Sequence, residues 1–262
     1  MTYLYQQFNN QNKNLLLLNM LKIFRNIRRK YLAEGKSTSY LKYAIGEIFL
    51  VVVGILIALQ INNWNETRKK TNSEHQILTT IKRSLINDTL MFRDAANNAR
   101  RSNQAIKFLL TKPPFSDTLT TTFVLALSAT TIQSNKSAFE QLKSLGLEMV
   151  KNDSLRDQLV KHYDFNLERG IFRNKYNLGD FNANVFYPFY RKHLFFSASD
   201  TTFQDLKYLP SDYAALINNP EFTSLLLEKW IYNTQTADDI IANLNRHTTT
   251  LIKAIDSELN TK

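Results

Sequence analysis

The sequence predicts an all-α protein in which one N-terminal transmembrane helix is followed by an antiparallel helical bundle with long first and last helices. The first observation is an apolar stretch, residues 44–61, which only Glu47 and Gln60 interrupt. The second is apolar residues that recur at helical spacing over 78–109 and again over 222–255, while strand signals are weak throughout. These patterns predict four segments, which are 1–19, 20–42, 43–64 and 65–262.

The positive charge lies mainly before the apolar stretch. The chain has a formal net charge of +10, and residues 1–43 hold eight Lys or Arg against a single acidic residue, Glu34. Residues 65–262 are nearly balanced, with 25 basic and 21 acidic side chains. Flanking charge of this kind sets membrane orientation, whereas nucleic-acid binding needs a basic surface on the folded domain. We therefore expect a cytoplasmic N-terminus, an outer domain at 65–262 and no nucleic-acid partner.

The N-terminal flank has two parts. Residues 1–19 are rich in Asn and Gln and are predicted to be a disordered extension, with Met20 as an alternative true start. Residues 20–32 alternate apolar and basic side chains as an amphipathic helix does, so that 20–42 is predicted to be a basic amphipathic cytoplasmic flank. Such a flank either lies on an anionic inner leaflet or is solvated and only fixes the topology.

The membrane segment is predicted at residues 43–64. At 1.5 Å per residue a helix of this length spans roughly 31 Å, about one hydrocarbon core. Tyr43 and Trp64 stand at its two ends, as the aromatic belts of membrane helices do. No A-x-A cleavage site follows it, which favours an uncleaved signal anchor over a cleaved signal peptide.

Three residues of the anchor could do more than span the bilayer. Glu47 is either an intramembrane functional carboxylate or a group that reaches the headgroup interface. Gly54 and Ala58 form a small-xxx-small pair, which is the basis for a homodimer hypothesis and also arises by chance.

The outer domain opens with a helix that is predicted to run to about Thr111 and to stop at Pro113 and Pro114. Its core positions repeat every seven residues, with Asp88 and Ser102 as breaks in the apolar pattern. The repeating residues are Leu78, Leu85, Phe92, Ala99 and Ile106, with Ile81, Ala95 and Leu109 between them.

Three further helices are predicted after this one, besides a shorter helical stretch at 118–129. One covers 134–146 with Gly146 as its C-cap, and another begins at Asp153 or Ser154. The last begins at Asn219 and Pro220 and runs to about Leu259. Its predicted apolar face contains Phe222, Leu226, Trp230, Ala237, Ile240, Leu244, Leu251 and Ile255. His247 falls on the same face and is predicted to be a core histidine that a neighbour hydrogen-bonds.

Aromatic residues are concentrated between Tyr163 and Tyr213, where 51 residues hold 14 of the 31 aromatic side chains. They form either a core layer between helices or a surface for a partner or ligand, since aromatic side chains dominate interfaces. The candidate surface residues are Phe181, Phe186, Tyr187, Phe189, Tyr190, Phe195 and Phe196.

The composition excludes several kinds of chemistry. The chain has no cysteine, so disulfides, thiolate nucleophiles and zinc–thiolate sites are excluded. Six scattered glycines form no phosphate-binding loop and no nucleophile elbow. The four histidines, at 75, 162, 193 and 247, lack the spacing of a helix-borne metal site. We therefore expect no cofactor and no metal.

Two segments carry a resemblance to a known family. The stretch EGKSTSYLKYAIGEIFLVVVGILIALQINNWNETRK at 34–69 resembles the opening of an uncharacterised bacterial family that is defined only as a domain of unknown function. SNKSAFEQLKSLGLEMVKNDSLRDQLVKHYD at 134–164 is similar to a later part of that family. The resemblance implies a single-pass protein of the bacterial inner membrane with its C-terminal domain in the periplasm. It implies no activity.

Three functions follow as hypotheses. The leading one is a membrane-anchored, non-enzymatic interaction module whose helical outer domain binds a protein partner. The alternative is a small-ligand sensor with an aromatic-lined pocket, and the third is an unrecognised enzyme. A deep polar pocket would favour the ligand hypothesis, whereas exposed aromatic side chains on a bundle without a pocket would favour a protein partner.

Overall fold

The computed structural model describes residues 22, 25–26, 37–198 and 206–261. The predicted extension at 1–19 and most of the predicted flank at 20–42 lie outside these residues. The chain divides into two compact units, Met1–Lys69 and Lys70–Lys262. Both units draw on the helix α2, Ser37–Leu110.

The first unit contains the predicted membrane segment. Residues 43–64 all lie within α2. None of the residues in the most apolar window of this helix is buried, and the helix is long and apolar enough to cross a membrane. The described part of the chain therefore contains one helix that fits the predicted transmembrane span.

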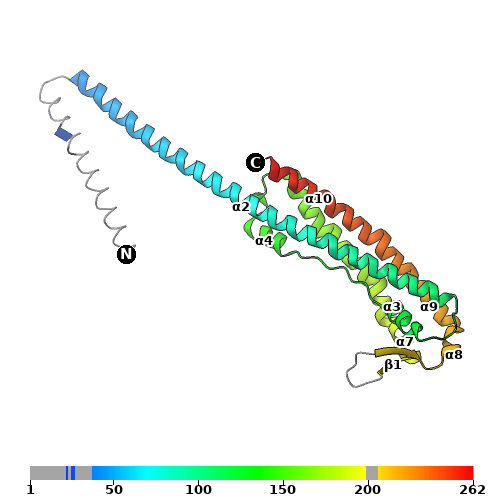
Figure 1. Ribbon diagram of the computed structural model, residues 1–262. Coiled ribbons are helices and arrows are strands. Elements are labelled where there is room, and N and C mark those ends of the chain that lie inside the picture. The colour runs from blue at the N-terminus through cyan, green and yellow to red at the C-terminus, as the bar shows by residue number, and fades with distance from the viewer. Residues whose placement is uncertain (1–21, 23–24, 27–36, 199–205, 262) are drawn as a thin grey trace. The chain divides into compact units, whose positions relative to one another are not determined.

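Three long helical segments form the second unit (Figure 1). The first is α2 from Lys70 onward. The middle helix, residues 153–193, consists of α5 Asp153–Val160, η2 Lys161–Leu167, α6 Glu168–Asn174, η3 Lys175–Gly179, η4 Asn182–Phe186 and α7 Tyr187–His193. The last helix, residues 220–260, consists of α9 Pro220–Thr234, η5 Gln235–Ile241 and α10 Ala242–Asn260.

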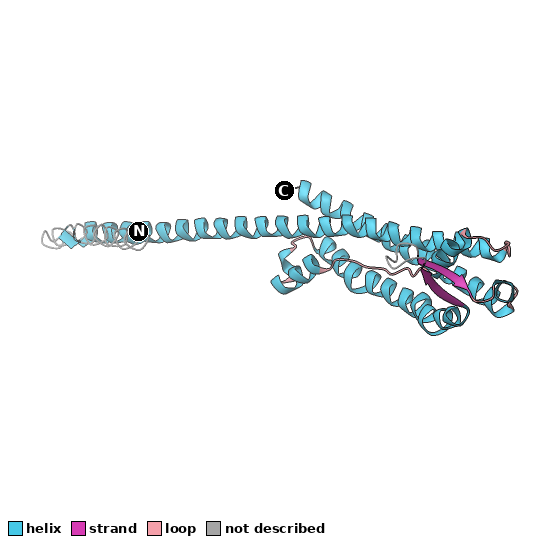
Figure 2. Cartoon of the chain, turned by 60° about the horizontal axis from the view of Figure 1, so that its bottom comes forward, coloured by secondary structure: helices cyan, strands magenta, loops and turns pink. Residues whose placement is uncertain are grey.

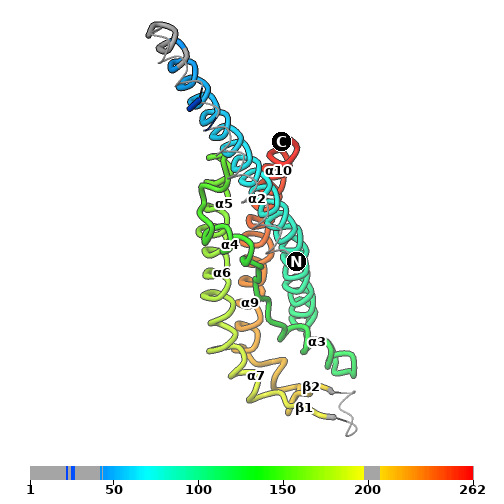
Figure 3. The backbone as a smooth tube through the Cα atoms, turned by 90° about the vertical axis from the view of Figure 1, so that its left-hand side faces the viewer, coloured from blue at the N-terminus to red at the C-terminus, as the bar shows by residue number. Residues whose placement is uncertain are grey.

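The last helix runs antiparallel to both of the others. Its ion pairs Lys82–Asp256 and Arg100–Asp238 join increasing positions of α2 to decreasing positions of the last helix. The middle helix follows the direction of α2, because an extended segment at 128–136 returns the chain before the middle helix begins (Figure 3). The long first and last helices were predicted, but shorter helices were expected in place of the long middle one.

Short elements connect the long helices. α3, Thr118–Leu127, follows α2, and α4, Ser137–Leu145, with the 3₁₀ turn η1, Leu147–Met149, precedes the middle helix. A hairpin of β1, Leu194–Ala198, and β2, Leu206–Pro210, and then α8, Tyr213–Ile217, lead to the last helix. Figure 2 shows both strands at the end of the bundle where α7 ends.

The hairpin corrects the all-α prediction. Its strands pair antiparallel with Phe196 opposite Tyr208, and these two rings lie 4.5 Å apart. Each strand has five residues, too few for the alternation of polar and apolar side chains to be distinguished from a short helical segment.

The helix ends agree with most of the predicted caps. α2 ends at Leu110, before Pro113. Gly146 follows α4 with φ of +101°, a conformation that L residues rarely adopt. Asn219 caps α9 by accepting from the amide of Glu221, with Pro220 in the first turn. The cap of α5 is Asn152, one residue before the predicted one, and its side chain accepts from the amide of Leu155.

The core follows the predicted repeat of α2. All eight predicted core residues of this helix are buried. They contribute to two clusters along the bundle, one built around Phe92, Phe139 and Leu159, the other around Phe123, Phe186 and Phe222. The seven-residue repeat therefore identified the buried face of α2 correctly.

The apolar face of the last helix departs from the prediction at two positions. Trp230 is 42% exposed and His247 is exposed, while Lys229 and Thr248, their neighbours in sequence, are buried. Within α9 the buried face continues from Leu225 to Lys229, and within α10 it continues from Leu244 to Thr248, so each predicted residue lies one position away from the buried face. His247 is therefore not a core histidine.

Buried polar side chains hold the extended segment 128–136. The Asn174 amide donates to the carbonyl of Thr130 over 3.0 Å. The Asp88 carboxylate accepts from the Ser134 hydroxyl at 2.5 Å and from the backbone N–H of Asn135 at 3.1 Å. Burial raises the pKa of Asp88, and these two hydrogen bonds oppose that rise. Asp88, which breaks the apolar repeat, thus provides hydrogen-bond acceptors for a segment whose backbone has no strand partner.

Candidate functional site

The seven aromatic residues predicted as a surface lie mostly in the core. Phe186 and Tyr190 are fully buried, and Phe181 and Phe189 are each 6% exposed. Tyr187 is half-buried, and its hydroxyl donates to the carbonyl of Leu127 over 3.2 Å. The rings of Phe189 and Phe222 stack with centroids 5.8 Å apart. These five residues form the core layer that was the alternative interpretation.

Only the hairpin residues of that set face solvent. Phe195 is 49% exposed and Phe196 is 70% exposed. The candidate aromatic surface is thus reduced to these two residues of β1.

Lys229 is the most unusual ionisable group of the bundle. Its side chain is fully buried, and its ammonium lies 4.4 Å from the centre of the Phe186 ring. The ammonium donates to Asn182 Oδ1 at 2.9 Å and to the Leu127 carbonyl at 3.4 Å. Burial lowers its pKa to about 7. Leu127 is the last residue of α3, so the Lys229 ammonium caps the C-terminus of this helix. Because the Lys229 side chain is completely buried, a substrate has no access to it.

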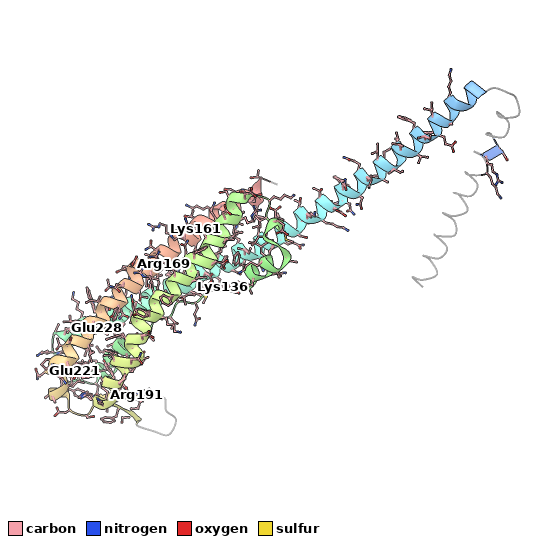
Figure 4. The ribbon with its side chains drawn as sticks, turned by 180° about the vertical axis from the view of Figure 1, so that it is seen from behind. Lys136, Lys161, Arg169, Arg191, Glu221 and Glu228 are labelled. Carbon is pink, nitrogen blue, oxygen red and sulfur yellow. The ribbon has the colours of Figure 1, made fainter. Side chains whose placement is uncertain are left out.

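A groove runs between the middle helix and the last helix. Its volume is about 310 Å³. Asn166, Arg169, Gly170 and Arg173 line one side, and Asp239, Ile240, Asn243, Leu244 and His247 line the other. Figure 4 labels Arg169, with Lys161 and Arg191 on the same helix. Because the two helices run antiparallel, the groove extends from Arg173 and Asp239 at one end to Asn166 and His247 at the other.

One ion pair crosses the groove. Arg173 donates to Asp239 Oδ2 at 2.9 Å, and the Asn243 amide donates to Asp239 Oδ1 at 2.8 Å. Arg169 and His247 form no hydrogen bond or ion pair with any residue that the structure describes. The groove thus has one end where charges are paired and another with an unpaired guanidinium and an imidazole.

Gly170 lets the last helix pack closely against the middle helix at the groove. A Cβ at this position would lie 2.9 Å from Leu244 Cδ1 and 3.4 Å from Ile240 Cγ2. Any side chain here would push the two helices apart or fill the space between them. The buried side chains of Ile240 and Leu244 therefore form an apolar floor beneath a polar rim.

Beside the groove, three aromatic side chains are exposed on the middle helix. Phe165, Phe172 and Tyr176 are 65%, 65% and 66% exposed. Their spacings of seven and four residues place them on one side of the helix. The rings of Phe172 and Tyr176 stack with centroids 6.0 Å apart. We call these three residues the outer aromatic face.

The predicted anchor residues lie along α2. Trp64 is 65% exposed, with the Arg68 guanidinium 5.9 Å from its ring centre. Glu47 is half-exposed, and no atom outside its own helix lies within 4 Å of the Cβ position of Gly54. Ala58 is exposed, and the side chain of Tyr43 lies outside the described residues.

The sequence contained a signal for the groove that the prediction did not use. Arg169 and Arg173 are four residues apart, as are Asp239, Asn243 and His247. Each set occupies one helix face, but nothing in the sequence says that the two faces meet. Among the residues that the structure describes, no group of three His, Asp or Glu side chains is placed to hold a metal ion.

Together the fold and the groove define a helical protein whose described residues contain one helix that could cross a membrane and a helical bundle with an open polar groove. Residues 47–104 match the model of a family of unknown function, DUF6090. The match covers the apolar segment of α2 from Glu47 onward and most of the part of α2 that packs in the bundle. No curated protein and no solved structure matches the chain.

Proposed function

We propose that this protein is a membrane-anchored, non-enzymatic interaction module whose helical bundle binds another protein through the outer aromatic face. The observation that carries the proposal is the exposure of about two thirds of Phe165, Phe172 and Tyr176 on one side of one helix. Contiguous exposed aromatic surface is uncommon on soluble domains and is typical of interaction sites.

The proposed anchor is residues 43–64, in a single-pass arrangement with the N-terminus in the cytoplasm. The excess of Lys and Arg before the apolar stretch supports this orientation. A bacterial inner membrane and a periplasmic bundle are proposed from the family resemblance.

Cross-linking in native membranes tests the proposal. A photoactivatable amino acid at Phe172 should capture one reproducible protein, because this side chain would lie inside the interface. The double variant Phe165→Ala and Tyr176→Ala should lose that product. The matched control is Leu227→Ala, which removes a side chain that is 47% exposed on the last helix and should leave capture unchanged.

Two outcomes would contradict the proposal. Cross-links to lipid alone would show that no protein covers the outer aromatic face. Cross-links to a second copy of the chain alone would replace a heterologous partner by a homodimer.

The ligand hypothesis receives separate support from the groove. The predicted aromatic-lined pocket is filled by the core layer of Phe181, Phe186, Phe189 and Tyr190. The groove between the middle and last helices is the polar site that a small ligand would use instead.

A further inference from the structure

The unpaired groups of the groove indicate the charge of its ligand. Arg169 has its five guanidinium donors available, since no described residue accepts from them. His247 and Asn166 line the same end of the groove and add further polar groups. An oxyanion is the ligand group that a planar guanidinium binds best, through two parallel hydrogen bonds.

Asp239 limits that ligand to one negative charge. Both of its carboxylate oxygens already accept, one from Arg173 and one from Asn243. Arg173 is therefore neutralised, and a second negative group at this end would approach a carboxylate with no free cation to offset the repulsion.

The floor of the groove indicates the rest of the ligand. Gly170, Ile240 and Leu244 line the groove below the polar rim, and the two side chains are 3% and 2% exposed. A volume of about 310 Å³ holds about ten heavy atoms at roughly 30 Å³ each. This surface suits a short hydrocarbon and gives nothing to a fully hydrated ion such as phosphate.

We propose that the groove binds a small monocarboxylic acid, with its carboxylate on Arg169 at the His247 end and its hydrocarbon on Ile240 and Leu244. The Arg173–Asp239 ion pair closes the other end and limits the length of the ligand. This site is separate from the outer aromatic face and does not depend on a protein partner.

Ligand-observed NMR on the full chain in detergent tests the proposal, with butyrate as the probe. Butyramide is the neutral isostere, and inorganic phosphate is the anion without a hydrocarbon. Butyrate should bind saturably, and both comparison compounds should bind at least tenfold more weakly. Arg169→Gln should raise the dissociation constant for butyrate at least tenfold, and Arg169→Lys should give an intermediate value because it keeps the charge and loses the planar fork.

The matched control is Arg191→Gln. Arg191 is also exposed and lies on the same helix, outside the groove, so its replacement should change butyrate affinity by less than twofold. Circular dichroism of each variant checks that the fold is kept, and the exposure of both arginines favours this.

Three results would overturn the proposal. Equal affinity for butyrate and butyramide would show that the groove binds the hydrocarbon and does not distinguish a charged ligand from a neutral one. Unchanged butyrate affinity in Arg169→Gln would place binding elsewhere. No butyrate binding, together with loss of the Phe172 cross-link in Arg169→Gln, would assign the groove to the protein interface.

Discussion

Replacing Lys229 with methionine should remove a pH dependence that this single buried amine gives to the stability of the bundle. Burial lowers the pKa of Lys229 from 10.5 to about 7 in the folded protein. The unfolded chain keeps the higher value, so between these two pH values it binds a proton that the folded protein has released. The free energy of unfolding therefore rises with pH across this window.

The magnitude follows from the two pKa values. One proton of difference contributes about 1.4 kcal/mol for each pH unit. Because the folded amine is still half-protonated near pH 7, the gain from pH 7 to pH 9.5 is about 3 kcal/mol. Methionine has nearly the same length and no charge, so Lys229→Met should lack this gain. At pH 9.5 the variant should also lose about 1–3 kcal/mol because Asn182 Oδ1 is left buried without its donor.

Urea unfolding of the full chain in detergent, followed by near-ultraviolet circular dichroism, measures both curves. The unfolding free energy of the wild type minus that of Lys229→Met should increase by about 3 kcal/mol from pH 7 to pH 9.5. Lys161→Met is the matched control, because Lys161 is exposed, and its curve should run parallel to that of the wild type. Parallel curves for Lys229→Met as well would refute the reasoning, since they would show a hydrated ammonium with an ordinary pKa.

Three other predictions concern a buried histidine, a glycine and the membrane orientation. Burial, with a contribution from His247, lowers the pKa of His162 from 6.5 to about 4. The free energy of unfolding of the wild type should therefore fall by about 2 kcal/mol from pH 7 to pH 4.5, because the unfolded chain takes up a proton that the folded protein does not. Urea unfolding of His162→Leu should show no such loss, and an equal loss in the variant would assign the effect to other groups. Gly146→Ala should cost about 1–3 kcal/mol because of its positive φ, whereas Gly179→Ala, with no neighbour closer than 3.8 Å, should be neutral or stabilising in thermal unfolding. Since the chain has no cysteine, Lys253→Cys in intact cells should react with an impermeant maleimide and Lys22→Cys should not; the reverse pattern would invert the proposed orientation.

The first and last helices could be predicted from the sequence because each is specified many times over. The repeat of α2 returns every seven residues from Leu78 to Ile106, so single exceptions did not hide it. Pro113 and Gly146 ended their helices for local steric reasons that need no tertiary context. The start of the middle helix was predicted at Asp153 or Ser154, but its full length was not, because its three π-helical segments disturb the period that a prediction follows.

The groove could not be predicted, because its properties arise between helices. Arg169 and His247 are distant in sequence, and only the antiparallel packing brings them to one site. Arg173 is paired with Asp239 and Arg169 is unpaired. This difference depends on distances between the two helices, which the sequence does not give. His247 itself was assigned to the core because a spacing of three and then four residues from Leu244 to Leu251 selects His247, whereas a spacing of four and then three selects Thr248, which is the buried one.

Four of the polar residues that interrupt the apolar faces have a common physical cause. Ser102 donates to the carbonyl of Ala126, Lys229 to that of Leu127 and Asn174 to that of Thr130. Asp88 accepts from the amide of Asn135. All four contacts reach the end of α3 or the extended segment after it, whose backbone groups have no strand partner. Where such a group is buried, as at Ala126 and Thr130, leaving it unpaired would cost about 1–3 kcal/mol.

It follows that the extended segment 128–136 requires these polar residues, because they form hydrogen bonds with its backbone and with the end of α3. Each long helix supplies at least one of them, Asp88 and Ser102 from α2, Asn174 from the middle helix and Lys229 from the last helix. An apolar residue at such a position would lengthen the hydrophobic face and leave a buried backbone carbonyl or amide unsatisfied. A polar residue on an otherwise apolar helix face can therefore serve an irregular segment that crosses the bundle, as these four residues do, whereas Thr248 donates to the Leu244 carbonyl within its own helix.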